Sequence, residues 1–508
     1  MTMPTRSIHA GVPALLLLAL AGATRGGAGE APVAEPPPPA DAMPGGPLRP
    51  LCITSLGSAG DDEVVAVAIA PDYSVLAAGN TIDLALPGVP EIILGPPGTL
   101  VAAPPPNPKL KDQPHPSTHG FVLRTSSDGR KALSYVHFGY GQATIQHLRL
   151  GENGSIYLSG TRGAGQGGAY LAKLAADGRS LAWMVGCDRL QDFAVDRDGE
   201  VVALVGTALV RYAAGDGKEL WTATWSCHGD NRPGAMTLSV QTGIAAVVGY
   251  GMTKTGHEPY KDPYGYGFDR QGKLVWSAWN PDPTHECDAK YGGNGLMADT
   301  TGHAAGVTAD GKIMLMLYAD GGNTVCGRDP ADPFKPLPPE VFAGVHQGGP
   351  GFGFHGASKT SVILRFDAAS GKIEKGTWMS AWLTPQHANG LSIDAACGDT
   401  KSGILVVGNS ASGCPLKEPW FPFVEGTYKG GGFLALFDAD FKLHQCGYFA
   451  HSRMTCVAAR GGYVVVGGSI QEGEGDDAVK DPVKLFHPLQ VKLGGGRDGY
   501  LAVFHLQQ

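Results

Sequence analysis

One unit recurs along the chain, and it limits the possible folds more than any other feature. In this unit an apolar strand runs into a tight turn, a second strand ends in Gly, and a third and a fourth strand follow. The third and fourth strands are joined by "DGR", "DGK", "QGK" or "ASGK", where Gly supplies the positive φ of the turn. Self-similarity of this kind is typical of solenoids and propellers. The units begin near Val64, Ile145, Asp192, Met236, Leu296, Leu391 and Met454.

Four antiparallel strands per unit, with little helical periodicity, predict an all-β fold, namely a seven-bladed β-propeller. A chain of 508 residues is too long for one ordinary domain unless it forms a repeat or closed β architecture. Six or eight blades remain as alternatives, because the units near Leu296 and Leu391 are irregularly spaced along the sequence.

The last unit has only three strands, which end in "GYLAVFHLQQ", and an unassigned strand, "PLCITSLGS", precedes the first unit. We expect the N-terminal strand from about Leu51 to Ser58 to complete the last blade. Such closure ties both ends of the domain into one sheet and removes the edge that an open ring would expose.

The N-terminus has the features of a secretory signal peptide. Arg6 and His9 precede the apolar run "GVPALLLLALAGA", which is too short to span a bilayer and ends in small residues. We therefore predict a signal peptide over residues 1–23, a Pro-rich linker over 24–50 and a single propeller domain over 51–508. The mature protein is expected to be periplasmic or extracellular, without a transmembrane segment.

The repeats resemble those of a known family. "HGFVLRTSSDGRKALSYVHFG", "AYLAKLAADGRSLAWMVG" and "ILVVGNSASG" are similar to the repeats of bacterial exported seven-bladed propellers called SBBP proteins. The resemblance covers the chain after the linker and implies the fold, but it implies no activity. "AAGDGKELWTATW" at 213–225 also resembles one repeat of quinoprotein dehydrogenases. That family usually has eight such Trp-bearing repeats, so a single one gives little support to a quinone cofactor.

The connections between second and third strands are long, and we expect them on one face of the propeller. Long loops on a rigid scaffold are commonly functional, so this face is the expected binding face. Its aromatic residues could line a groove for sugars or peptide side chains, or they could instead form small cores that hold their own loops in place. The candidate ligand-binding residues are Tyr260, Tyr264, Tyr266, Phe352, Phe354, Trp420, Phe421 and Phe423.

Histidines occur in four of the connections that lead from one blade to the next, next to carboxylate and amide side chains. Imidazole nitrogens and carboxylate oxygens are donors that a divalent metal accepts. We expect His285 and His387 to be the central pair of such a site, with Glu286 or Asp288 as a third donor. His228 and His451 complete the candidate metal ligands. Alternatively, these are ordinary histidines of surface loops.

Net charge and cysteine content limit the kinds of partner and of scaffold that the chain can have. The formal net charge is -8, and the sequence has no cluster of Lys and Arg, so we expect no nucleic-acid partner. Nine Cys are too sparse for a disulfide-built scaffold, and Cys326 with Cys414 is the first pair to expect, since both fall in corresponding loops of neighbouring repeats.

These observations lead to two functional hypotheses. The first is an exported binding or scaffold propeller that recognises a glycan, a peptide or an envelope partner through the face with the long loops. The alternative is a metal-assisted lyase or hydrolase that uses the His-bearing loops.

Overall fold

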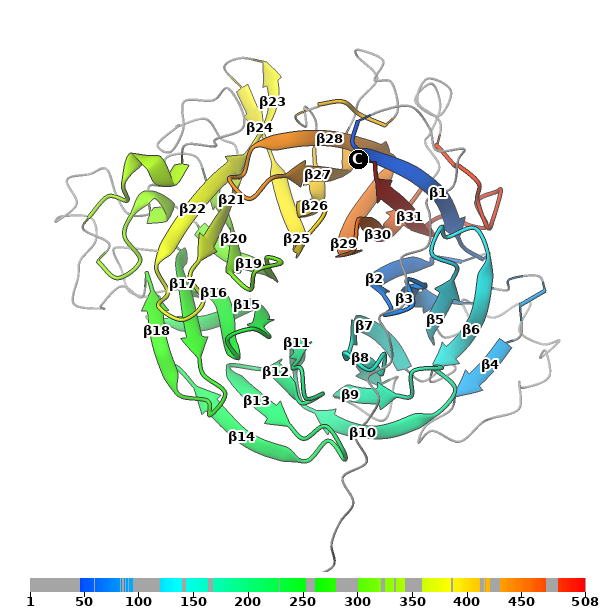
Figure 1. Ribbon diagram of the computed structural model, residues 1–508, viewed down its shortest axis with the longest axis horizontal. Coiled ribbons are helices and arrows are strands. Elements are labelled where there is room, and N and C mark those ends of the chain that lie inside the picture. Colours follow the sequence, from blue (N-terminus) through cyan, green and yellow to red (C-terminus); the bar gives the residue numbers. More distant parts are fainter. Residues whose placement is uncertain are drawn as a thin grey trace, which may run out of the picture. The chain divides into compact units, whose positions relative to one another are not determined.

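The computed structural model contains seven antiparallel sheets that form the blades of a β-propeller (Figure 1). The prediction of seven blades is confirmed. The chain divides into two compact units, Met1–Ala34 and Glu35–Gln508, and the first lies outside the described residues. The structure describes residues 46–58, 60–82, 84, 86, 88–89, 91–94, 119–138, 143–162, 168–227, 229–252, 261–279, 300–320, 325–332, 335–342, 359–384, 387–411, 415, 417–420, 430–471 and 483–507.

In the first four blades the strands follow one another from the centre outward. Blade 1 consists of β2 (Glu63–Ile69), β3 (Val75–Thr81), β5 (His119–Thr125) and β6 (Ala132–Phe138), and β4 (Glu91–Leu94) pairs in parallel with the outer strand β6. Blade 2 consists of β7 (Ala143–Leu150), β8 (Ile156–Arg162), β9 (Ala169–Leu174) and β10 (Leu181–Cys187). Blade 3 consists of β11 (Leu190–Val195), β12 (Val201–Val205), β13 (Ala208–Tyr212) and β14 (Glu219–Thr224). Blade 4 consists of β15 (Asp230–Ser239), β16 (Ile244–Met252), β17 (Lys261–Phe268) and β18 (Leu274–Ala278).

The remaining blades complete the ring. Blade 5 consists of β19 (Thr300–Val307), β20 (Ile313–Asp320), β21 (Lys359–Phe366) and β22 (Ile373–Met379), with the short helices η2 (Val325–Gly327) and η3 (Pro339–Phe342) between β20 and β21. A hairpin of β23 (Ala381–Thr384) and β24 (His387–Asn389) follows. Blade 6 consists of β25 (Leu391–Asp399), β26 (Gly403–Ser410), β27 (Gly431–Phe437) and β28 (Leu443–Ala450). Blade 7 consists of β29 (Ser452–Arg460), β30 (Tyr463–Ile470), β31 (Asp498–Leu506) and β1 (Leu48–Leu56).

The N-terminal strand closes the ring, as the sequence predicts. Strand β1 pairs with β31 in antiparallel register from Leu48 opposite Leu506 to Leu56 opposite Gly499. It begins at Leu48 rather than at Leu51, and Leu51 and Ile53 are fully buried. Blade 7 therefore contains three strands from the C-terminal end of the domain and one from its N-terminal end.

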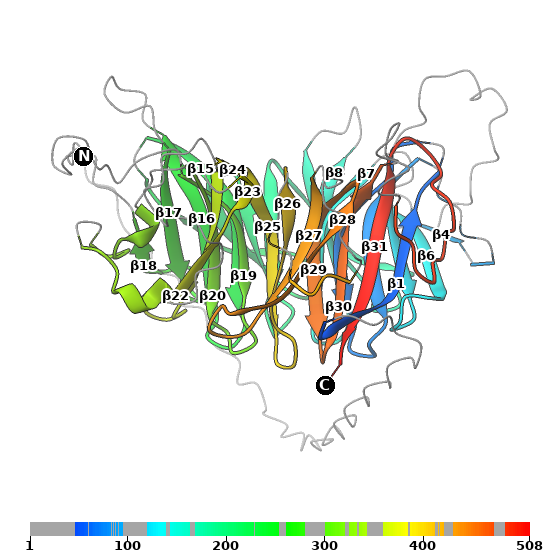
Figure 2. The same cartoon turned by 90° about the horizontal axis from the view of Figure 1, so that it is seen from above.

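The blades pack on one another through apolar side chains from both faces of each sheet. A typical cluster joins Val248 of blade 4 to Leu315 and Leu364 of blade 5, and all three are fully buried. The short turns that join first to second and third to fourth strands lie at one end of the strands. The long connections lie at the other end, together with the connections between blades (Figure 2). This end is called the insertion face below.

Tryptophans reinforce the contacts between neighbouring blades. Each lies on the fourth strand of one blade and donates its indole N–H to a carbonyl in the last turn of the next blade: Trp183 to Ala214 (3.1 Å), Trp221 to Arg270 (2.9 Å) and Trp276 to Ala368 (2.8 Å). A Cβ on Gly371, which has φ 69°, would approach the ring of Trp276 to 2.5 Å, so the turn needs Gly for both backbone and space. Of the three, only Trp221 lies in the segment whose sequence resembles a Trp-bearing repeat, at 213–225.

Two buried histidines lie on adjacent strands of blade 1. His119 and His137 are 1% and 3% exposed, and Nε2 of His119 is 2.7 Å from Nδ1 of His137. Burial, and then the charge of His119, lower the pKa of His137 to about 4. The imidazole of His137 is therefore neutral in the folded protein at pH 7.

Six cysteines in the described part of the chain are free thiols: Cys52, Cys187, Cys227, Cys326, Cys397 and Cys456. Burial raises the pKa of Cys52, Cys326, Cys397 and Cys456 to about 12, so these thiols are poorly reactive near neutral pH. Cys326 is one of the free thiols, and its expected partner Cys414 lies outside the described residues.

Deleting residues 48–56 should lower the free energy of unfolding by several kcal/mol, because it removes the buried outer strand of blade 7 and exposes a sheet edge. Deleting residues 24–45 is the matched control and should change little. Denaturant unfolding measures both. Equal losses from the two deletions would show that β1 does not hold the ring closed.

Acidification should destabilise the protein through His137. Its pKa is about 4 in the folded protein and about 6.5 in the unfolded chain, so the unfolded state binds more protons between these values. The contribution is complete above pH 6.5 and is lost as the pH falls toward 4, on the order of 2–3 kcal/mol. His137→Gln should show a flatter dependence of stability on pH than the unchanged protein. Parallel curves would contradict this assignment.

Candidate functional site

Every first strand of the seven blades contains a β-bulge at the same level. The register shifts between Val64 and Ala66 in blade 1 and between Ile145 and His147 in blade 2, and the other five first strands show the same shift. A bulge inserts one residue that has no partner in the ladder, and the side chain of this residue can point in a direction that a regular strand would not allow. The inserted residues are Val65, Gln146, Gln191, Gly234, His303, Asp394 and Thr455.

These seven residues form a ring around the central channel, and we call them the bulge ring. All of them line a cavity of about 770 Å³ enclosed by the first strands. The first strands contact one another around the whole circle, from β2 through β7 and β11 to β29. The bulge ring therefore supplies one side chain, or a bare backbone at Gly234, from each blade to one cavity.

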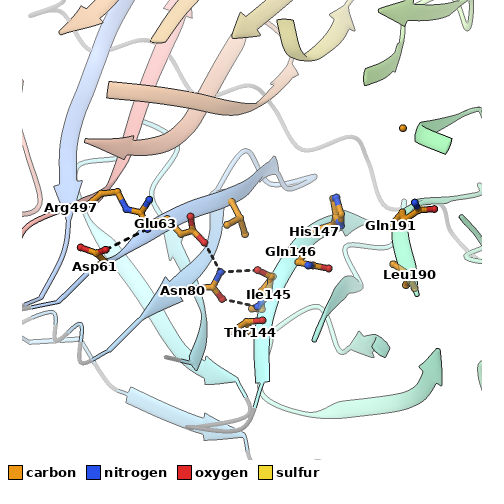
Figure 3. Close-up of a pocket in the computed structure, with 12 residues that line it drawn as sticks. Asp61, Glu63, Asn80, Thr144, Ile145, Gln146, His147, Leu190, Gln191 and Arg497 are labelled. Atoms are coloured by element: carbon orange, nitrogen blue, oxygen red, sulfur yellow. Dashed lines mark hydrogen bonds and ion pairs between the residues drawn. The ribbon is translucent and has the colours of Figure 1, made fainter. Parts of the chain in front are cut away.

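A second cavity, of about 890 Å³, lies at the mouth of the channel between blades 1, 2 and 3 (Figure 3). It is on the insertion face, because it is lined by the starts of β2, β7 and β11 and by the end of β3. Most of its lining is polar: Asp61, Glu63, Asn80, Thr144, Gln146, His147, Gln191 and Arg497, with Val65, Ile145, Leu190 and Gly234.

An asparagine fixes the wall of this mouth. Asn80, at the end of β3, donates from Nδ2 to the carbonyl of Ile145 (2.9 Å) and accepts from the Ile145 N–H (2.8 Å). Nδ2 also donates to Oε1 of Glu63 at 3.1 Å, as Figure 3 shows. The amide thus joins blade 1 to blade 2 and orients a carboxylate toward the cavity. Asn409 joins blade 6 to blade 7 in the same way, through Met454.

Beside the mouth, His147 is held in a polar cluster that is structural. Nδ1 of His147 is 3.0 Å from Oγ of Ser159, and Nε2 is 4.0 Å from Asp192. Burial, and the charge of Arg149, lower the pKa of His147 against the opposing effect of Asp192. Ser159 is fully buried, so this Ser, His and Asp arrangement offers no nucleophile to a substrate. Asp192 instead accepts hydrogen bonds from Arg149 (3.1 Å) and from the Met236 N–H (3.1 Å).

The opposite side of the bulge ring carries His303 and Asp394. Nε2 of His303 donates to the carbonyl of Ile393 at 2.5 Å, which links blade 5 to blade 6, and Nδ1 has no hydrogen-bond partner among the described residues. Asp394 accepts a hydrogen bond from Asn409 at 2.5 Å. Burial raises the pKa of Asp394, against the opposing charges of His303 and Arg453. This side of the channel therefore contains both acidic and basic groups.

The described parts of the long connections cover the outer edges of their own blades. Strand β4 pairs with β6 in blade 1, Phe342 of η3 packs on Trp378 in blade 5, and in blade 7 Phe486 pairs with Ile53. In blade 6 Lys417 pairs with Cys446 and Trp420 stacks on Phe449 with ring centroids 5.3 Å apart. These segments cover the outer strands. This agrees with the alternative that aromatic residues of the long connections form small cores that hold their own loops in place.

Three of the candidate ligand-binding aromatic residues are therefore part of the core. Trp420 is 3% exposed, and Tyr264 and Tyr266 are each 1% exposed. The two tyrosines belong to β17 rather than to the preceding loop, and they pack together with ring centroids 5.1 Å apart. Their hydroxyls donate to Asn231 Oδ1 (2.5 Å) and to the carbonyl of Ser226 (2.8 Å). The expectation that these three rings line an open groove is wrong for the structure described.

The other candidate aromatics, Tyr260, Phe352, Phe354, Phe421 and Phe423, lie outside the described residues. The same holds for the candidate metal ligands His228, His285, Glu286 and Asp288.

His387 begins β24, opposite Thr384. His451 lies between β28 and β29 with φ 56°, and its carbonyl accepts a hydrogen bond from the Gln471 N–H. Within the described ranges no group of three or more His, Cys, Asp or Glu side chains could hold a metal ion. A metal site therefore remains a prediction.

Sequence reasoning missed the bulge ring, although the sequence carries a signal for it. In a regular strand, residues on one face recur every second position. In β7 the buried residues Ile145 and Leu148 are three positions apart, and in β11 Leu190 and Phe193 show the same spacing. One extra polar residue at the same place in successive repeats indicates a bulge.

Comparisons with known proteins give no family. No protein-family model matches the chain. No curated protein has a significantly similar sequence. Among solved structures, the chain is similar to BamB from Moraxella catarrhalis, with a TM-score of 0.37 and 10% sequence identity over 77% of this chain and 94% of that chain. At this level of similarity the comparison says nothing about function. No helix in the described part of the chain has the length and hydropathy needed to cross a membrane.

Replacing Asn80 by Leu should lower the free energy of unfolding by about 1–3 kcal/mol, because it leaves the buried N–H and carbonyl of Ile145 without partners. Gln146→Ala should change it by less than about 0.5 kcal/mol, since the exposed Gln146 side chain has no hydrogen bond within the described structure. Chemical denaturation compares the two. An equal loss from Gln146→Ala would show that the bulge ring stabilises the fold rather than facing a ligand.

Proposed function

We propose that this protein is an exported binding propeller that holds a polar ligand, a glycan or a peptide, at the channel mouth on the insertion face. One observation carries the proposal: each blade adds a bulge residue to one ring around the channel, and several of these residues are polar. Bulges of this kind commonly serve to re-aim side chains at functional sites.

The polar groups of the mouth are available to a ligand. Gln146 and Gln191 are exposed to the cavity, and the only hydrogen bond that the Gln191 side chain makes to the described residues is a long one, 3.4 Å to the carbonyl of Pro233. Among the described residues, Glu63 accepts a hydrogen bond only from Asn80. Amide and carboxylate groups with free capacity, presented from rigid strands, suit a ligand that offers both donors and acceptors.

Metal-assisted lyase or hydrolase chemistry remains the alternative hypothesis, and it depends on His285, His387 and their neighbours. At the described part of the mouth, the one hydroxyl paired with a histidine, that of Ser159, is fully buried, so the Ser159 and His147 pair does not support nucleophilic chemistry there.

The test is a binding screen of the purified protein against immobilised glycans and short peptides, read as retained ligand. We expect the double variant Gln146→Ala and Gln191→Ala to bind the retained ligands at least tenfold more weakly than the unchanged protein. Each lost hydrogen bond costs about 0.5–1.5 kcal/mol. The matched control, Gln241→Ala with Gln271→Ala, removes two glutamines from turns at the opposite end of the blades.

Retention that is equal in both double variants would contradict binding at the mouth. Elemental analysis of the same preparation distinguishes the alternative: a stoichiometric transition metal, with turnover of a retained glycan, would replace the binding proposal by the enzymatic one.

A further inference from the structure

Two opposite charges that line the central cavity have no ion-pair partner among the described residues. Glu63 lies on β2 and Arg453 on β29, each two residues before the bulge residue of its strand. Both line the central cavity, and β2 and β29 are in contact, so the two residues occupy equivalent places on adjoining blades. Within the described structure neither side chain forms an ion pair.

Several other charged groups of the mouth and channel lie close to an opposite charge. Asp61 lies 3.8 Å from Arg497, and Arg149 lies 3.1 Å from Asp192. Within the described structure Glu63 and Arg453 have no ion-pair partner at such distances; the charge of Arg453 acts on the carboxyl of Asp394, which is itself hydrogen-bonded to Asn409. Glu63 is moreover oriented, because Asn80, which bonds to it, is fixed by two main-chain hydrogen bonds.

We propose that Glu63 and Arg453 together recognise a zwitterion, a free amino acid or a short peptide with unblocked ends. This inference rests on the proposed binding function and names its ligand class. The ammonium group would face the carboxylate of Glu63, and the carboxylate would accept hydrogen bonds from the guanidinium of Arg453. Arg is well suited to this role, since its planar fork binds a carboxylate in bidentate fashion. The amides of Gln146 and Gln191 are then placed to pair with a peptide backbone.

A neutral glycan fits the described mouth less well. Sugar rings commonly stack on exposed aromatic faces. Among the described residues that line the two cavities, the one aromatic side chain besides histidine is Phe193, and it is fully buried. A charged ligand also gains more in a partly enclosed cavity than in open water, because opposite charges attract more strongly where the dielectric constant is lower.

The test is calorimetric titration of the full-length mature protein with alanine, dialanine and trialanine, so that several charge separations are sampled. The blocked forms N-acetyl-dialanine and dialanine amide each lack one charge, and maltose represents a neutral sugar. We expect at least one unblocked probe to bind and each blocked form to bind about tenfold more weakly, as for loss of a charged hydrogen bond.

Two variants test which side chain binds which charged end of the ligand. Glu63→Gln should lower the affinity for the unblocked probe to the affinity that the unchanged protein has for the N-acetylated form. Arg453→Gln should lower it to the affinity for the amide. Glu219→Gln and Arg179→Gln are matched controls on the exposed periphery and should leave every affinity unchanged.

Equal affinity of blocked and unblocked peptides, or absence of binding by all peptide probes, would overturn the zwitterion assignment. If maltose binds and the Gln146 and Gln191 double variant loses it, the proposed binding function stands and only the ligand class is wrong. If probes bind but that double variant and both charge variants keep full affinity, the mouth is not the site, and both proposals fail.

Discussion

Closure of the ring by the pairing of β1 with β31 is the constraint on which the rest of the structure depends. Each blade is a small sheet with two apolar faces, and it is stable only between two neighbours (Figure 1). Once Leu48–Leu56 completes blade 7, every blade has two neighbours and the seven first strands converge on one channel. The tryptophans and the two asparagine bridges add directed hydrogen bonds to this apolar packing. The site is a consequence of closure, because residues from distant parts of the chain meet only there.

The bulges explain how a cavity suited to a ligand arises in a fold whose strands are otherwise apolar. A paired strand residue points into the packing between blades, whereas the inserted residue has no partner and faces the channel. The fold can therefore vary Gln146 and Gln191 without disturbing the ladder. Around this ring, bridges such as Asn80 to Ile145 stay fixed. Stability and recognition are thus carried by neighbouring but different residues.

Much of the fold follows from the sequence, and little of the site does. Seven units, short turns and a strand missing from the last unit predict the blade number and the closing strand, because these depend on local turn chemistry and strand periodicity. The site depends on register, which strand periodicity alone does not reveal. Tyr264 and Tyr266 stand next to Gly and Pro and resemble loop residues, yet pairing with β16 extends β17 to include them. Glu63 and Arg453 are 390 residues apart in the sequence and are brought to adjoining blades only by ring closure.

The central claim, that ligand occupies the bulge ring, is tested most directly by thiol protection. The Gln146→Cys variant places a reactive thiol at the mouth, whereas native thiols such as Cys397 and Cys456 have a pKa near 12 and react slowly. The rate of maleimide addition is measured with and without a saturating retained ligand, and Gln271→Cys, in a turn at the opposite end of the blades, is the control. The account predicts slower modification of Gln146→Cys alone. Unchanged rates for both variants, or protection of Gln271→Cys, would contradict it.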